Sequence, residues 1–65
     1  MTATARTALM ITLAITAHRS GLPPNDDNAT LLADVEWRLN GHNGTAPEWV
    51  VNSAYRFLVE SHYKV

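Results

Sequence analysis

The sequence contains no cysteine, and this absence removes several ways in which a small protein can be stabilised or can act. Disulfides, thiolate metal sites and cysteine nucleophiles are all excluded. The chain has 65 residues, enough for one domain. A domain of this size buries only roughly 60% of the surface that its unfolded form exposes. Without disulfides, close helix packing or self-association is left to stabilise the fold.

The chain also lacks a strong charge of either sign. Five Lys and Arg stand against six Asp and Glu, and the basic residues are scattered. Nucleic-acid binders need a basic surface to neutralise phosphates, so this balance disfavours a nucleic-acid partner. The apolar stretch near the N-terminus is shorter than the about 20 residues that cross a bilayer, so a membrane partner is disfavoured too.

No arrangement typical of a catalytic site is present. The chain has no glycine-rich phosphate loop. Its three serines, Ser20, Ser53 and Ser61, lie in no strained nucleophile turn. Glu36 and Glu60 do not suggest a carboxylate pair, because a lone glutamate on a helix face is usually solvated. We therefore expect no catalytic residues and no enzyme activity.

The three histidines suggest a metal site only weakly. In an up-down-up bundle, two of them share one pole with an aspartate pair and the third lies at the other pole: His18 and His62 beside Asp26 and Asp27, and His42 opposite. Surface exposure and capping of helix ends explain these residues more simply than metal ligation. The sequence predicts neither a metal nor a cofactor.

Two helices are predicted in the first 40 residues. Residues 4–19 contain no Gly or Pro and are rich in Ala, Leu and Met. Gly21 can adopt the left-handed conformation that ends a helix, and the prolines at 23 and 24 prevent continuation. A second helix is expected over about 27–39, with an N-cap among residues 25–28 and a stop at Asn40-Gly41.

A third helix is predicted over about 46–62. Thr45 and Glu48 have the spacing of a capping box, with Thr45 as N-cap, and Pro47 falls in the first turn. No segment alternates apolar and polar residues between turn signals, so strands are not expected. The sequence predicts a single all-α domain over 1–65, a small up-down-up three-helix bundle.

Helical periodicity predicts which faces are buried in the second and third helices. In the second helix Leu31, Leu32, Val35 and Leu39 share one arc and form the expected core stripe. Trp37 falls on nearly the opposite side, either across the helix edge or as an exposed anchor for a partner. The third helix has an apolar arc of roughly 200°. That width lets it contact a second chain, through Tyr55 and Val59.

The first helix is apolar around most of its circumference. Its large apolar residues are Leu9, Met10, Ile11, Leu13 and Ile15. Two neighbours in a three-helix bundle cover only about half of a helix. Either Ile11 and Ile15 contact a second copy, another protein or a membrane surface, or the small Ala and Thr residues mark the outer face. We expect self-association, since a two-fold interface needs only one self-complementary patch.

These patterns predict a non-catalytic protein–protein interaction module in the cytoplasm, self-associating and binding or inhibiting a host or cognate protein. Its size, its Ala and Thr content and its preference for Arg suggest a bacterial or phage accessory protein of high-GC origin. One alternative is a small dimeric regulator that resembles a helix-turn-helix protein and reads DNA with Asn52, Ser53 and Arg56. Another is a membrane-associated or secreted protein that uses the first helix. Whether residues 1–17 act as a targeting signal is left open.

Overall fold

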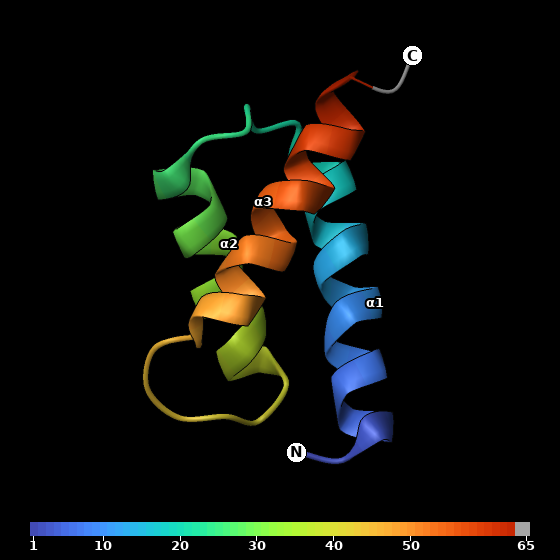
Figure 1. The fold of residues 1–65 in the computed structure, drawn as a ribbon, viewed down its shortest axis with the longest axis vertical. Coiled ribbons are helices and arrows are strands. Elements are labelled where there is room, and N and C mark those ends of the chain that lie inside the picture. Colours follow the sequence, from blue (N-terminus) through green and yellow to red (C-terminus); the bar gives the residue numbers. More distant parts are fainter. Residues whose placement is uncertain (64–65) are drawn as a thin grey trace.

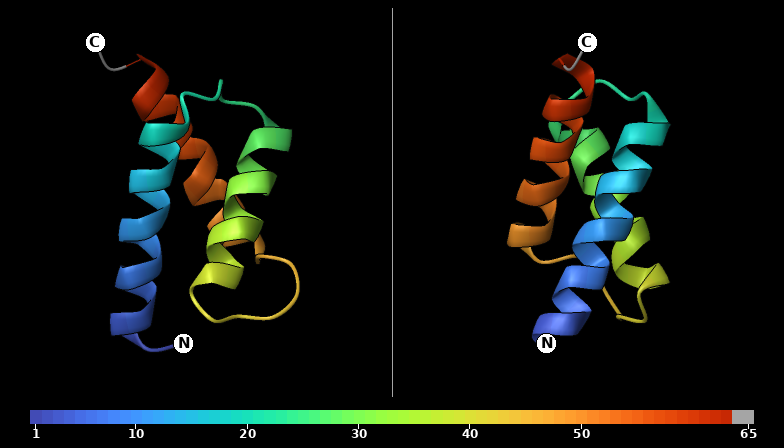
Figure 2. Two further views of the ribbon diagram at one scale, coloured as in Figure 1. Left: turned by 180° about the vertical axis from the view of Figure 1, so that it is seen from behind. Right: turned by 90° about the vertical axis from the view of Figure 1, so that its right-hand side faces the viewer.

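The computed structural model describes residues 1–63 and confirms an all-α three-helix bundle. Helix α1 (Ala3–Ser20) runs up, α2 (Asp26–Leu39) runs down and α3 (Glu48–Tyr63) runs up again (Figure 1). Helix α3 lies against both other helices on one side of the α1–α2 pair, and the opposite side of that pair is not covered by a helix of the described chain (Figure 2).

The ends of α1 and α2 follow the local signals in the sequence. Gly21 ends α1 with a φ of 64°, as predicted, and Leu22 beside it packs against the core. Asn25 is the N-cap of α2, and its Oδ1 accepts the backbone N–H of Asn28 at 2.8 Å. Each of these contacts spans a few residues, which is why sequence alone can predict it.

The start of α3 differs from the prediction. The helix begins at Glu48, and the Pro47 carbonyl accepts its first backbone hydrogen bonds, from Val50 at 3.0 Å and Val51 at 3.2 Å. Thr45 therefore lies two residues before the N-cap position, and the capping box was wrong. The Ala46 N–H donates instead to Oδ1 of Asp34 on α2, at 2.8 Å. A carboxylate is a stronger acceptor than a hydroxyl, so α2 holds the beginning of α3.

This arrangement predicts that Asp34, not Thr45, matters for stability. Asp34→Ala should lower the free energy of unfolding by about 1 kcal/mol through loss of one hydrogen bond. In a domain this small the melting temperature should fall by roughly 4–8 °C. Thermal melts followed by circular dichroism measure both variants. Thr45→Ala is the matched control and should leave the melt unchanged; a larger effect from Thr45 would support the capping box.

The core is built from three short apolar rows, one from each helix: Leu9, Leu13 and Ala17; Ala29, Leu32 and Ala33; Val50, Ala54 and Leu58. Several of these residues are alanines, which let the helices approach closely but bury little apolar surface. The large buried side chains are therefore few, and we expect modest stability for the isolated domain.

The rotation of α2 about its own axis was predicted wrongly. Of the expected core stripe only Leu32 is buried, while Leu31, Val35 and Leu39 are 55%, 42% and 74% exposed. The face turned inward carries Ala29, Ala33 and Glu36, and the partly buried Trp37 packs against the core beside it. Helix α2 carries apolar residues on two sides, so either side could face the core. The contacts of Trp37 and Asp34 with the 40–47 connection stabilise the rotation that buries Ala29 and Ala33.

Candidate functional site

The exposed large apolar side chains of α1 and α2 gather on one side of the molecule. Ile11 and Ile15 of α1 are 54% and 46% exposed, and Leu31, Val35 and Leu39 of α2 are the residues that the core left out. We call these five residues the α1/α2 face. Figure 2 shows that α3 packs on only one side of the α1–α2 pair, so the other side of the pair is left without a helix of the described chain.

A row of polar contacts between α1 and α2 shows why these residues share one side. Thr12 Oγ1 accepts from Asn40 Nδ2 at 3.1 Å, and Thr16 Oγ1 donates to Glu36 Oε1 at 2.5 Å. We call these four residues the polar seam. The residue before each is apolar and exposed: Ile11, Ile15, Val35 and Leu39. The residue before a seam residue is rotated by about 100° around the helix axis. Because both helices are right-handed and run antiparallel, this rotation directs the preceding side chains of α1 and α2 to the same side of the pair, away from α3.

Glu36 was expected to be solvated, and this prediction was wrong. The residue is only 4% exposed, and the Thr16 hydroxyl donates to its carboxylate. Asn40 supports the same region, because its Nδ2 also donates to the Glu36 carbonyl at 2.8 Å. The seam therefore accounts for two of the α1 threonines, which face α2 rather than solvent. Periodicity could not reveal this, since a charged residue is normally assigned to the outer face.

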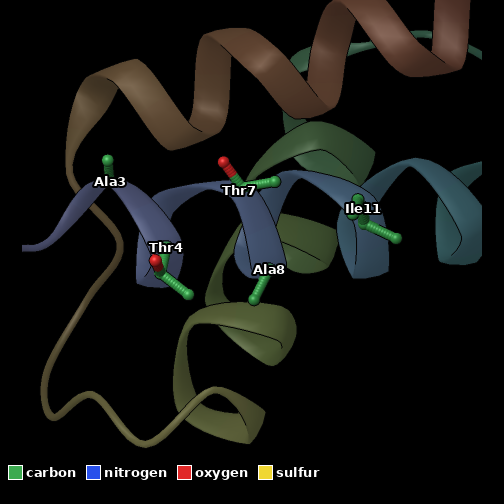
Figure 3. Close-up of a pocket in the computed structure, with 5 residues that line it drawn as sticks. All are labelled: Ala3, Thr4, Thr7, Ala8 and Ile11. Atoms are coloured by element: carbon green, nitrogen blue, oxygen red, sulfur yellow. The ribbon is translucent and has the colours of Figure 1, made fainter.

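The apolar surface continues toward the N-terminal end of α1. A shallow hollow is lined there by Ala3, Thr4, Thr7, Ala8 and Ile11, all on α1 (Figure 3). Apart from Ile11 the lining side chains are small, so the helix backbone lies close to the surface. Ala3 and Thr7 point toward α3 (Figure 3), so the hollow shares only Ile11 with the α1/α2 face.

The predicted partner-binding residues do not all meet at this face. Ile11 and Ile15 are exposed on it, as the sequence indicated. Tyr55 is 39% exposed and Val59 is partly buried, and both belong to α3, which packs on the other side of the α1–α2 pair. The sequence grouped these four residues because periodicity defines faces one helix at a time. Contact of Tyr55 and Val59 with a partner stays a prediction for a separate surface.

Trp37 makes contacts within the chain and does not present a free indole ring at the surface. Its Nε1 donates to the Asn43 carbonyl at 3.1 Å, and its ring stacks on His42 with centroids 4.0 Å apart. The side chain is partly buried against the core. These contacts hold the connection between α2 and α3, so Trp37 is a poor anchor for a second protein. This outcome agrees with the alternative of a tryptophan lying across the helix edge.

The residues proposed for DNA reading are divided by the fold. Asn52 and Arg56 are exposed on α3. Ser53 is only 7% exposed and donates its hydroxyl to the Trp49 carbonyl at 2.8 Å, so it was wrongly placed on a DNA-facing surface. Of the two residues left exposed only Arg56 carries a positive charge, and a single charge is a weak basis for binding a phosphate backbone.

A small cleft between α1 and α3 is lined by both polar and apolar residues: Ala14, His18, Phe57, Glu60 and Ser61. His18 Nδ1 and Ser61 Oγ are 3.5 Å apart, at the outer limit for a hydrogen bond. Within residues 1–63 no three His, Asp or Glu side chains come close enough to hold a metal ion. The expectation that the chain is not an enzyme stays a prediction.

Similarity to characterised proteins gives no further guidance. Comparisons with protein families, with curated proteins and with solved structures found no match. In the described part of the chain, no helix combines the length and the apolar character needed to cross a bilayer. The predicted cytoplasmic location stays a prediction.

Proposed function

We propose that this chain is a non-catalytic protein–protein interaction module that self-associates through the α1/α2 face. The supporting observation is the gathering of five large apolar side chains, each 42–74% exposed, on one side of a molecule of 65 residues. Single exposed apolar residues are normal, but a contiguous patch is typical of an interaction site.

The energetics favour covering this face. Full burial of a large aliphatic side chain stabilises by about 1.5–3 kcal/mol, so burying the exposed part of each of these residues is worth about 1 kcal/mol. The total is comparable with the whole stability of a small domain, about 5 kcal/mol. A core that relies on several alanines leaves little margin, and association with a partner stabilises the folded state by mass action.

Light scattering coupled to size-exclusion chromatography tests this proposal. We expect a mass above that of the 7.2 kDa chain at micromolar concentrations. Ile15→Asp and Val35→Asp should each shift the protein toward monomer, because a buried unpaired carboxylate opposes association. Asn52→Asp, exposed on α3, is the matched control and should leave the mass unchanged.

Two results would contradict the proposal. A clean 7.2 kDa species at high micromolar concentration would show that the chain does not self-associate. Association that survives both aspartate substitutions, with the helical circular-dichroism spectrum retained, would show that another surface is used. Binding or inhibition of a host or cognate protein is a further part of the proposal, tested by capture with the parent chain and loss of capture with the Val35→Asp variant.

A further inference from the structure

We infer that the occupant of the α1/α2 face is a second copy of this chain, turned about a two-fold axis parallel to the helices. In this dimer α1 of one copy lies over α2 of the other, and Ile15 fits between Val35 and Leu39 of the partner copy. The inference rests on the proposed function and adds to it the symmetry axis and the register of contact.

The polar seam defines the register. Its two hydrogen bonds place Thr12 level with Asn40 and Thr16 level with Glu36 along the bundle axis. Ile15 is therefore level with residue 37, midway between Val35 and Leu39. Rotation about an axis parallel to the helices preserves these levels. In the partner copy Val35 and Leu39 each lie two residues from the level of Ile15, about 3 Å along the helix axis. Ile15 can therefore enter the space between them, as a knob enters a hole in a coiled coil.

The other possible two-fold axis fits the face less well. An axis perpendicular to the helices, through the centre of the same face, reverses the levels in the second copy. Leu31 would then lie level with His42 of the other copy, and Ile11 would lie level with Ser20. Ile11 and Leu31 would thus have no apolar residue of the face within two residues of their level. About the parallel axis only Leu31, level with Gly21 of the other copy, lacks one, because Ile11 lies two residues from the level of Leu39.

The face is large enough for a stable dimer. Figure 1 looks down the shortest axis of the molecule, and the left view of Figure 2 shows the same molecule from behind, where α1 and α2 lie in front of α3. The face is therefore on the broad side, whose extents are 33 Å and 21 Å. A stable interface buries about 800 Å² on each partner, roughly a fifth of the 4352 Å² accessible surface. A rectangle with the two longer extents of the molecule has an area of about 700 Å², which is close to that value.

The polar seam does not oppose burial under a second copy. Its side chains already bond to one another and to backbone carbonyls within one chain. Within residues 1–63 no buried side-chain nitrogen or oxygen is left without a hydrogen-bond partner. Every side-chain donor of the seam thus has an acceptor within one chain. The remaining acceptor oxygens of Glu36 and Asn40 can be met by water at the interface, and the flanking apolar residues make the contact.

Cysteine cross-linking tests the register, because the natural chain has no cysteine and single variants give unambiguous products. Ile15→Cys and Val35→Cys proteins are mixed under reducing conditions, allowed to exchange, and oxidised. A disulfide needs Cβ atoms about 4 Å apart, so only positions that are neighbours across the interface react well. We expect on the order of tenfold more mixed disulfide than self-linked product from either variant alone, because thiols held side by side have a high effective concentration.

The control pairs Ile15→Cys with Asn52→Cys, which lies on exposed α3 and should give only background product. Light scattering on each reduced variant confirms that it still associates, and Leu39→Cys replaces Val35→Cys if that variant does not. Efficient self-linking of Ile15→Cys would overturn the parallel axis in favour of the perpendicular one. A dimeric mass with only background cross-linking would overturn the register but not self-association. A monomeric parent would overturn both.

Discussion

Replacing Leu13 by alanine should lower the free energy of unfolding by about 2–5 kcal/mol. Leu13 is fully buried in the middle of α1, among the apolar rows of all three helices. Its truncation removes apolar contact and leaves a cavity that a close-packed bundle cannot fill by collapse. Because the domain has few large core residues, a loss of this size threatens folding itself. Urea denaturation followed by tryptophan fluorescence measures it.

Leu39→Ala is the matched control, and it separates the observed fold from the one that periodicity predicted. Periodicity assigned Leu39 to the core, but its side chain is 74% exposed. In dilute protein we expect this variant to change the free energy of unfolding by less than about 0.5 kcal/mol. At concentrations where copies associate it should lose some stability, whereas Leu13→Ala loses it at every concentration. Equal losses from both variants in dilute protein would show that α2 is rotated differently.

Replacing Thr16 by valine should lower the free energy of unfolding by about 1.5–3 kcal/mol, although the two side chains have the same shape. The Thr16 hydroxyl donates to the carboxylate of Glu36, a residue only 4% exposed. Valine leaves that carboxylate in place without its donor, and an unsatisfied buried charge is costly. Thr4→Val, at an exposed position of the same helix, controls for the change in helix propensity and should have little effect.

A double-mutant cycle with Glu36→Leu shows whether the hydrogen bond causes the effect. Leucine removes the charge and retains an apolar contact at the same position. In that background Thr16→Val should cost less than about 0.5 kcal/mol, since no carboxylate remains to be satisfied. Chemical denaturation of the four proteins gives the coupling energy. Equal costs in both backgrounds would refute a structural role for this hydrogen bond.

The sequence by itself determined the features that depend on a few neighbouring residues. The stop of α1 at Gly21 and the cap of α2 at Asn25 each need a single local hydrogen bond or backbone conformation. The all-α class follows in the same way, because helix formers occupy three segments divided by Gly, Pro and Asn. The exposure of Ile11 and Ile15 was also predictable, since two neighbours cannot cover a helix that is apolar all round.

Only the tertiary structure decided the rotation of α2 and the beginning of α3. Both depend on contacts between residues of different elements: Trp37 with the connection after α2, Asp34 with Ala46, and Thr16 with Glu36. Periodicity ranks the sides of a helix by apolar content, but it contains no information about which polar groups will form hydrogen bonds with neighbouring elements. In α2 the buried side is the one whose polar and aromatic groups bond to other elements, and not the side richer in Leu and Val. Leu31, Val35 and Leu39 therefore stay exposed and form part of the α1/α2 face.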